Sequence, residues 1–137
     1  MVIVDQASAK AVVNELSNNT VTPVTVDVPE VDAALAKIAA NTATMSPEMA
    51  AHQGRVLVAL ATASDATGWY MLIGPYHPAT GIPVAKFDFT GQLVARMRLQ
   101  VPAFLSFVMQ MVATQDGALV ISSMDGDILV YRPRKGE

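Results

Sequence analysis

Residues 84–101 read VAKFDFTGQLVARMRLQV, and this stretch does most to decide the fold class. Apolar and polar residues alternate on both sides of Gly91, which is the pattern of two antiparallel strands joined by a turn. We expect strands at 84–89 and 93–101. One face of this hairpin carries apolar residues: Ala85, Phe87, Phe89, Leu93, Ala95, Met97, Leu99 and Val101. The other face is mostly polar, so we expect a sheet with one buried and one solvated face.

The pairing of these two strands follows from the same alternation. Placing Phe89 opposite Leu93 keeps apolar side chains together on one face. A two-residue turn at Thr90-Gly91 would instead place Asp88 in that position and mix the faces. We therefore predict a three-residue loop.

Other segments of the second half also have the composition of strands. Trp69–Ile73 is aromatic and aliphatic, and the Asp125-Gly126 pair predicts a hairpin between strands at Ala118–Ser123 and Ile128–Arg132. Residues 55–62 and 102–113 fit both a strand and a helix. For 55–62 we favour a strand, because the helical alternative runs through Gly54 and an interior glycine costs about 1 kcal/mol.

The first fifty residues contain helix signals. We expect one helix over Gln6–Ser17, capped by Asp5, and an extended edge segment over Val21–Val28. A second helix is predicted from Asp27, because Asp27 and Glu30 have capping-box spacing and Pro29 suits a first turn. Ser46-Pro47-Glu48 marks a third start.

These patterns predict one α+β domain over residues 1–137. Residues 1–50 are expected to be mainly helical, and residues 55–133 to form the antiparallel sheet. In this arrangement short N-terminal helices pack on an antiparallel β-meander of about five to seven strands.

The chain carries little charge for its size. Charged residues make up 15% and hydrophobic residues 52%, whereas soluble domains average about 25% charged residues. A chain of 137 residues leaves much of its surface exposed. We therefore expect the surplus apolar surface to lie in a contact between copies or in a ligand groove.

Composition and missing motifs exclude several function classes. A net charge of −3 argues against nucleic acid as a partner, and the lack of cysteine excludes thiolate metal sites and a cysteine nucleophile. No HExxH, GxxxxGK[ST] or G-x-S-x-G pattern occurs, so we expect no metal, no cofactor and no nucleophile elbow. Asp5 interrupts the apolar start, and no apolar run approaches the ~20 residues of a membrane span. We expect a soluble, cytoplasmic protein without a membrane partner.

Two groups of residues are candidates for binding a ligand or a partner. Tyr76 and His77 lie between two prolines in the long loop GPYHPATGIP, residues 74–83, and Trp69 precedes that loop. A stiff loop presenting tyrosine and histidine offers a hydrogen bond and an acid or base group. Arg96 and Arg98 share the outer face of one predicted strand and suit an anion, although pairing with Asp88 is a simpler role.

The last fifty residues resemble a β-propeller blade in their order of strands and glycine turns. The similarity is carried by KFDFTGQLVARMRLQVP and ATQDGALVISSMDGDILVYRP. The Trp-Asp dipeptide typical of such blades is missing. A chain with room for two blades would also not close a propeller, which needs four or more. The resemblance therefore assigns no family.

Three functions remain open. The first is a non-enzymatic module that assembles into a homo-oligomer, which the low charge and the missing catalytic motifs favour. The second is a binding protein for a small hydrophobic or amphipathic ligand in a cavity between sheet and helices. The third is a small cofactor-free enzyme that uses His77 with a carboxylate.

Overall fold

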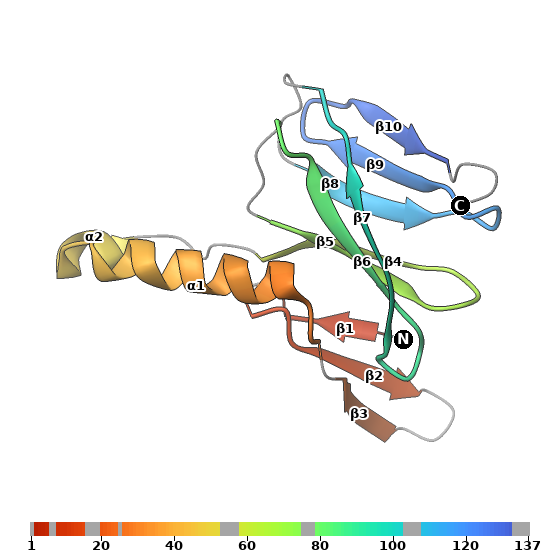
Figure 1. Ribbon diagram of the computed structural model, residues 1–137, viewed down its shortest axis with the longest axis horizontal. Coiled ribbons are helices and arrows are strands. Elements are labelled where there is room, and N and C mark those ends of the chain that lie inside the picture. The colour runs from red at the N-terminus through yellow and green to blue at the C-terminus, as the bar shows by residue number, and fades with distance from the viewer. Residues whose placement is uncertain are drawn as a thin grey trace.

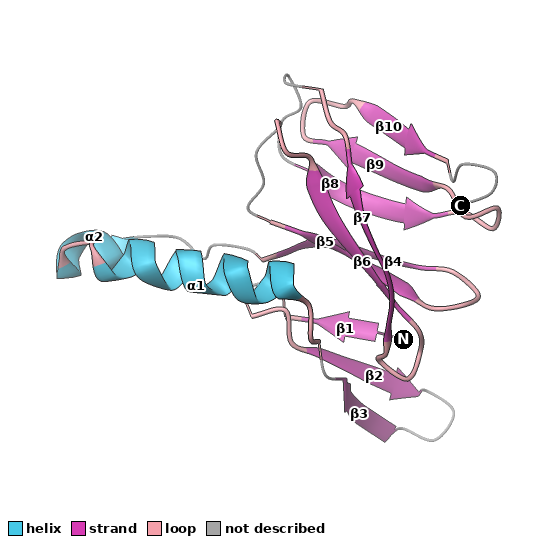
Figure 2. Ribbon diagram, in the orientation of Figure 1, coloured by secondary structure: helices cyan, strands magenta, loops and turns pink. Residues whose placement is uncertain are grey.

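The computed structural model describes residues 2–5, 8–15, 20–24, 26–52, 58–74, 79–102 and 108–132. In these residues the chain forms three antiparallel sheets and two helices, which confirms the predicted α+β class (Figures 1 and 2). The seven strands from β4 onwards match the number expected for this part of the chain, but they divide between two sheets.

The first sheet has the strand order β1-β2-β3, with β1 at Val2–Val4, β2 at Ala11–Glu15 and β3 at Thr20–Val24. The predicted helix over Gln6–Ser17 is therefore wrong. Residues 6, 7 and 16–19 lie outside the described part, but β2 occupies the middle of the segment. The edge position expected for the segment with Pro23 is confirmed, since β3 pairs only with β2 among the described strands.

Asp5 forms a tight turn between β1 and β2 and does not cap a helix. Its carboxylate accepts a hydrogen bond from the Ser8 hydroxyl at 2.6 Å, and its carbonyl accepts one from the Ala9 amide at 2.7 Å. Ala9 has a positive φ of 58°, a conformation suited to reversing the chain. The turn brings β2 back alongside β1 as its antiparallel partner. The valines of both strands favour this extended conformation.

Helix α1 spans Pro29–Ala43 and α2 spans Pro47–His52. The predicted start of α1 is confirmed, but its capping box is wrong, because Val28 occupies the N-cap position without a side-chain hydrogen bond. The Ser46 cap of α2 is confirmed by a 3.2 Å hydrogen bond from the Met49 amide to the Ser46 hydroxyl oxygen. Figure 1 shows the first turns of α1 against the sheets and its later turns extending away from them.

The central sheet is a four-stranded meander. Its order is β4-β5-β6-β7, with the bounds Ala59–Ser64, Trp69–Ile73, Ile82–Phe87 and Leu93–Leu99. The strand at Trp69–Ile73 is confirmed, as is the strand preference for 55–62 over its described end, because β4 begins at Ala59. Residues 53–57 lie outside the described part.

The predicted register of the 84–101 hairpin is wrong. Phe87, and not Phe89, lies opposite Leu93, and the register shifts between Lys86 and Phe87. Asp88 explains the longer turn, because its Oδ1 accepts hydrogen bonds from the Thr90 amide and hydroxyl and from the Gln92 amide. Phe89 is consequently in the turn and exposed.

The third sheet has the order β10-β9-β8, with bounds Ile128–Tyr131, Leu119–Ser123 and Val108–Ala113. The predicted hairpin at Asp125-Gly126 is confirmed, since β9 and β10 pair across it. The described end of 102–113 is a strand, β8, while 103–107 lie outside the described residues.

Both faces of the central sheet are covered, which corrects the expectation of one solvated face. On one face, Trp69, Met71, Ile73, Ala85 and Phe87 pack with residues of α1 and the first sheet. On the other, the core combines residues of the central sheet and the third sheet: Ala61, Tyr70, Leu72, Ile82, Val84, Leu99, Met111, Leu119 and Ile121. Trp69 and Tyr70 therefore both lie in cores, although they point to opposite faces. The alternation expected for residues 93–98 is confirmed on β7, the outermost strand of the sheet.

Three hairpin turns share one construction. Asp88, Thr114 and Ser123 each donate their amide to the carbonyl four residues later, and their side-chain oxygens accept the amide of that same residue. Each turn then places a glycine at positive φ: Gly91, Gly117 and Gly126. This is the geometry of a hairpin loop closed by a glycine bulge.

Candidate functional site

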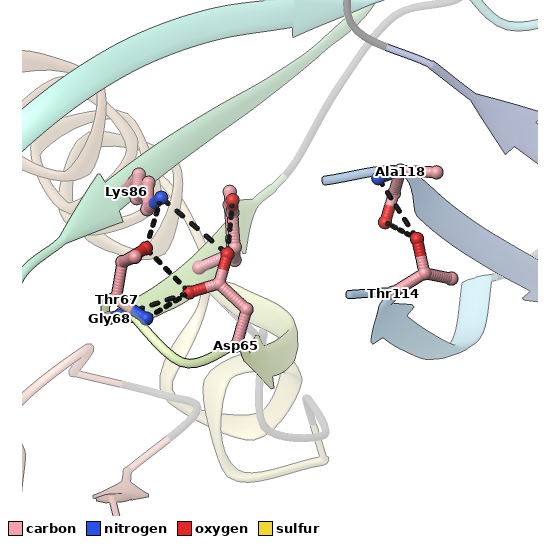
Figure 3. Close-up of polar contacts among 7 residues, drawn as sticks. Asp65, Thr67, Gly68, Lys86, Thr114 and Ala118 are labelled. Carbon is pink, nitrogen blue, oxygen red and sulfur yellow. Dashed lines mark hydrogen bonds and ion pairs between the residues drawn. The ribbon is translucent and has the colours of Figure 1, made fainter. Parts of the chain in front are cut away.

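The turn between β4 and β5 holds a partly buried polar cluster around Asp65 (Figure 3). Asp65 Oδ1 accepts hydrogen bonds from the Thr67 amide at 2.8 Å, the Thr67 hydroxyl at 2.7 Å and the Gly68 amide at 3.0 Å. Its Oδ2 accepts one from the Tyr70 hydroxyl at 2.9 Å. Lys86 on β6 completes the cluster: its Nζ lies 2.7 Å from Thr67 Oγ1 and 3.5 Å from Asp65 Oδ2.

The cluster keeps its acid and base in their charged forms. Burial alone raises the pKa of Asp65, but the hydrogen bonds from Thr67 and Tyr70 and the charge of Lys86 outweigh it and hold that pKa well below its usual range. Burial lowers the pKa of Lys86, but Tyr70 and Asp65 raise it overall. The Lys86 ammonium also lies 5.0 Å from the centre of the Tyr70 ring. A lysine held protonated in this way is a poor general base, so the cluster fixes the turn.

Arg96 contacts helix α1, and not Asp88 as expected. Its guanidinium donates hydrogen bonds to both carboxylate oxygens of Glu30, with Nε 3.2 Å from Oε2. The hydrogen bond and charge of Arg96 hold the pKa of Glu30 below its usual range. Arg96 therefore joins β7 to the first turn of α1.

Arg98 lies two residues along the same strand, at a cleft between α1 and the central sheet. The cleft has a volume of about 470 Å³, and Arg98 shares its wall with Glu30 and Lys37 of α1. The Arg98 guanidinium donates to the Thr80 carbonyl at 3.4 Å. Arg96 and Arg98 thus share a sheet face, as expected, but they have different surroundings.

Trp69, another candidate from the sequence, does not line this cleft among the described residues. Trp69 is 1% exposed and stacks on Phe87, with 4.4 Å between the ring centres. Tyr76 and His77 lie outside the described residues. Lys86, on β6 beside the strand that carries the two arginines, points to the opposite face of the sheet, where it contacts Tyr70.

The third sheet presents an exposed apolar surface, which we call the outer face. Val112, Val120 and Val130 lie directly opposite one another on β8, β9 and β10. The neighbouring row consists of Gln110, Ser122 and Ile128. Val112 is 56% exposed, Val130 is 52% exposed and Ile128 is 68% exposed. Unlike the inner face, which packs on the central sheet, the outer face keeps these three side chains more than half exposed.

Charge is confined to the rim of the outer face. Arg132, which follows β10, and Asp116, in the turn after β8, form an ion pair with a 3.1 Å contact. Neither row of the outer face contains a charged residue. Strand β10 hydrogen-bonds only to β9 among the described strands, so its second edge is also open.

The outer face has a sequence signal that composition alone does not show. The predicted strands at 118–123 and 128–132 both have apolar residues at consecutive positions, as in Leu119, Val120 and Ile121. Such runs are typical of strands with apolar residues on both faces. The pattern therefore indicates a second apolar face on this sheet.

Among the described residues, no group of three or more histidine or acidic side chains is placed to hold a metal ion. Neither α1 nor α2 has the length and hydropathy needed to cross a bilayer.

In the described residues the fold is α+β, with antiparallel sheets packed on one another and an apolar outer face that is largely exposed. Comparison of the chain with models of protein families, with curated proteins and with solved structures gives no match.

Proposed function

We propose that this chain is a non-enzymatic assembly module that associates with a second copy of itself through the outer face. The observation that carries the proposal is the row of Val112, Val120 and Val130, which runs across all three strands of the sheet and has Val112 and Val130 more than half exposed. Exposing an apolar row of this kind to water is unfavourable. Covering it with a matching apolar surface lowers the free energy.

Sheet stacking already organises the rest of the molecule. The central sheet is covered on both faces, and the third sheet buries its inner face against it. The outer face offers the same β-branched, antiparallel surface for one more layer. A two-fold axis would place this row against the same row of the second copy, which is the usual geometry of a homodimer.

The charges are compatible with contact between identical surfaces. The two rows of the outer face carry no charge, and the rim charges of Asp116 and Arg132 neutralise each other within one copy. Two copies therefore meet without like-charge repulsion at the centre of the contact. Because three short strands offer a small area, we expect association that depends on concentration.

Sedimentation velocity of charged variants tests this proposal. Val112→Glu places a carboxylate at the centre of the outer face and should shift the protein to monomer. Val94→Glu is the matched control, because Val94 is also 52% exposed but lies on β7 of the central sheet. Val130→Glu provides a second test on β10, and circular dichroism checks that each variant folds. If Val112→Glu and Val130→Glu associate as strongly as the wild type, the outer face is not the contact.

A further inference from the structure

We propose that the cleft between α1 and the central sheet binds a small amphipathic anion, whose head group contacts Arg98 and Lys37. This inference concerns a different surface from the outer face and does not depend on the proposed self-association. The cleft volume of about 470 Å³ lies within the range of about 300–1,000 Å³ that small-molecule sites occupy.

One face of α1 forms a wall of the cleft. Glu30, Ala33, Ala34 and Lys37 follow one another at helical spacing and therefore lie on the same side of the helix. The two alanines between the charged residues leave room beside the sheet. The opposite wall includes Ile73 and Pro83. The lining of the cleft thus combines apolar side chains with charged ones.

The balance of charge in the cleft favours an anion. Glu30 contributes a carboxylate, but Arg96 already holds both of its oxygens. Among the described residues, Arg98 makes only a long contact to a neutral carbonyl, although its charge also acts on Glu30. Lys37 forms no ion pair with any residue in the described part of the chain. The cleft therefore has two cations available to a ligand.

The chemistry of these two cations defines the class of ligand. The planar guanidinium of Arg98 matches the two oxygens of a carboxylate or phosphate, and the Lys37 ammonium adds a mobile point charge. Burying an apolar group of the ligand against Ile73, Pro83 and the two alanines makes binding more favourable. We expect an acid with a short apolar body, and not a free inorganic ion.

Titration of the ¹⁵N-labelled protein with matched probes tests the inference by NMR. The probes are octanoate, octyl phosphate and octanol, which share one chain and differ in the head group. The amides of Ala33, Ala34, Gly74 and Gly81 should shift with at least one of the two anions, and much less with octanol. A preference between octanoate and octyl phosphate distinguishes a carboxylate ligand from a phosphate ligand.

Two variants separate the site from general surface binding. Arg98→Gln should weaken binding of the preferred anion by about tenfold or more, because a hydrogen bond to a charged group is lost. Arg132→Gln is the matched control on the third sheet and should leave binding unchanged. Ala33→Leu, at an exposed helix position, should block the cleft without changing its charge. Equal shifts with octanol, shifts away from these four amides, or no shift with any probe would overturn the inference.

Discussion

Arg96 on β7 donates two hydrogen bonds to Glu30 in the first turn of α1, across 66 positions of the sequence. The geometry is bidentate, which is the favourable arrangement for a guanidinium and a carboxylate. It connects the helix to an edge strand of the central sheet, and Glu30 also lines the cleft.

We predict that Glu30→Gln and Arg96→Gln each weaken the attachment of α1 slightly, and that the double variant is no less stable than the worse single variant. Exposed ion pairs contribute little, so each effect should be small. Urea denaturation followed by circular dichroism measures the coupling. Glu30→Gln combined with Arg132→Gln is the control cycle and should be additive.

Asp65 should make the stability of the fold depend on acid pH. Its pKa is lowered in the folded protein, so its stabilising contribution is present above the unfolded value of 3.8 and is lost as the pH falls towards the folded value. We expect Asp65→Asn to cost about 1–3 kcal/mol at neutral pH, because it breaks a partly buried cluster of hydrogen bonds to a charged group. Its stability should then vary less than the wild type below about pH 4.

Denaturation curves from pH 7 to pH 2.5 measure this difference. Asp32→Asn, at an exposed position on α1, is the control for removing a carboxylate that lies outside the cluster. An Asp65→Asn curve that runs parallel to the wild type would show that the cluster does not link folding to pH.

Two glycine positions should respond very differently to alanine. A Cβ atom at Gly68 would lie 2.0 Å from the Phe87 carbonyl oxygen, a backbone atom that has little freedom to move. We expect Gly68→Ala to cost about 3 kcal/mol or more. Gly126 has a φ of +88° but open space around it, so Gly126→Ala should cost only about 1 kcal/mol.

Thermal unfolding of the two variants compares these costs directly. Gly126→Asn should recover part of the loss, because asparagine tolerates the left-handed conformation. Equal destabilisation by the two alanine variants would contradict the close backbone approach at Gly68.

Trp69 reports on the core between the central sheet and α1. It is the only tryptophan in the chain, and it stacks on Phe87 at 4.4 Å. Phe87→Ala should cost about 3–5 kcal/mol by leaving a cavity, and should shift the tryptophan emission to the red. Phe89→Ala, two residues away and exposed, is the control and should change stability by less than about 1 kcal/mol.

Strong local patterns predicted much of the fold. Pro29 marked the start of α1, and Asp125-Gly126 marked the hairpin of β9 and β10. The helix predicted over Gln6–Ser17 is wrong because its apolar residues, including Ala11, Val12 and Val13, also suit a strand. The turn closed by Asp5 and Ala9, with pairing to β1, decides between the two.

The surroundings of the candidate residues depended on contacts between distant segments. Alternation along 93–101 identified the outward arginines, but it gave no sign that Glu30 meets Arg96. Burial of both Trp69 and Tyr70 requires a layer on each face of the sheet. The continuous apolar run of Trp69–Ile73 is the sequence signal for burial on both faces. The alternation of the 84–101 hairpin indicates only one buried face.

The central claim is that the outer face joins two copies of the chain. The most direct test is the solution mass of the wild-type protein, measured by light scattering across a concentration series. The account predicts a mass that rises above 14.5 kDa with concentration and levels at twice that value. A mass of 14.5 kDa at every concentration up to the millimolar range would contradict the claim.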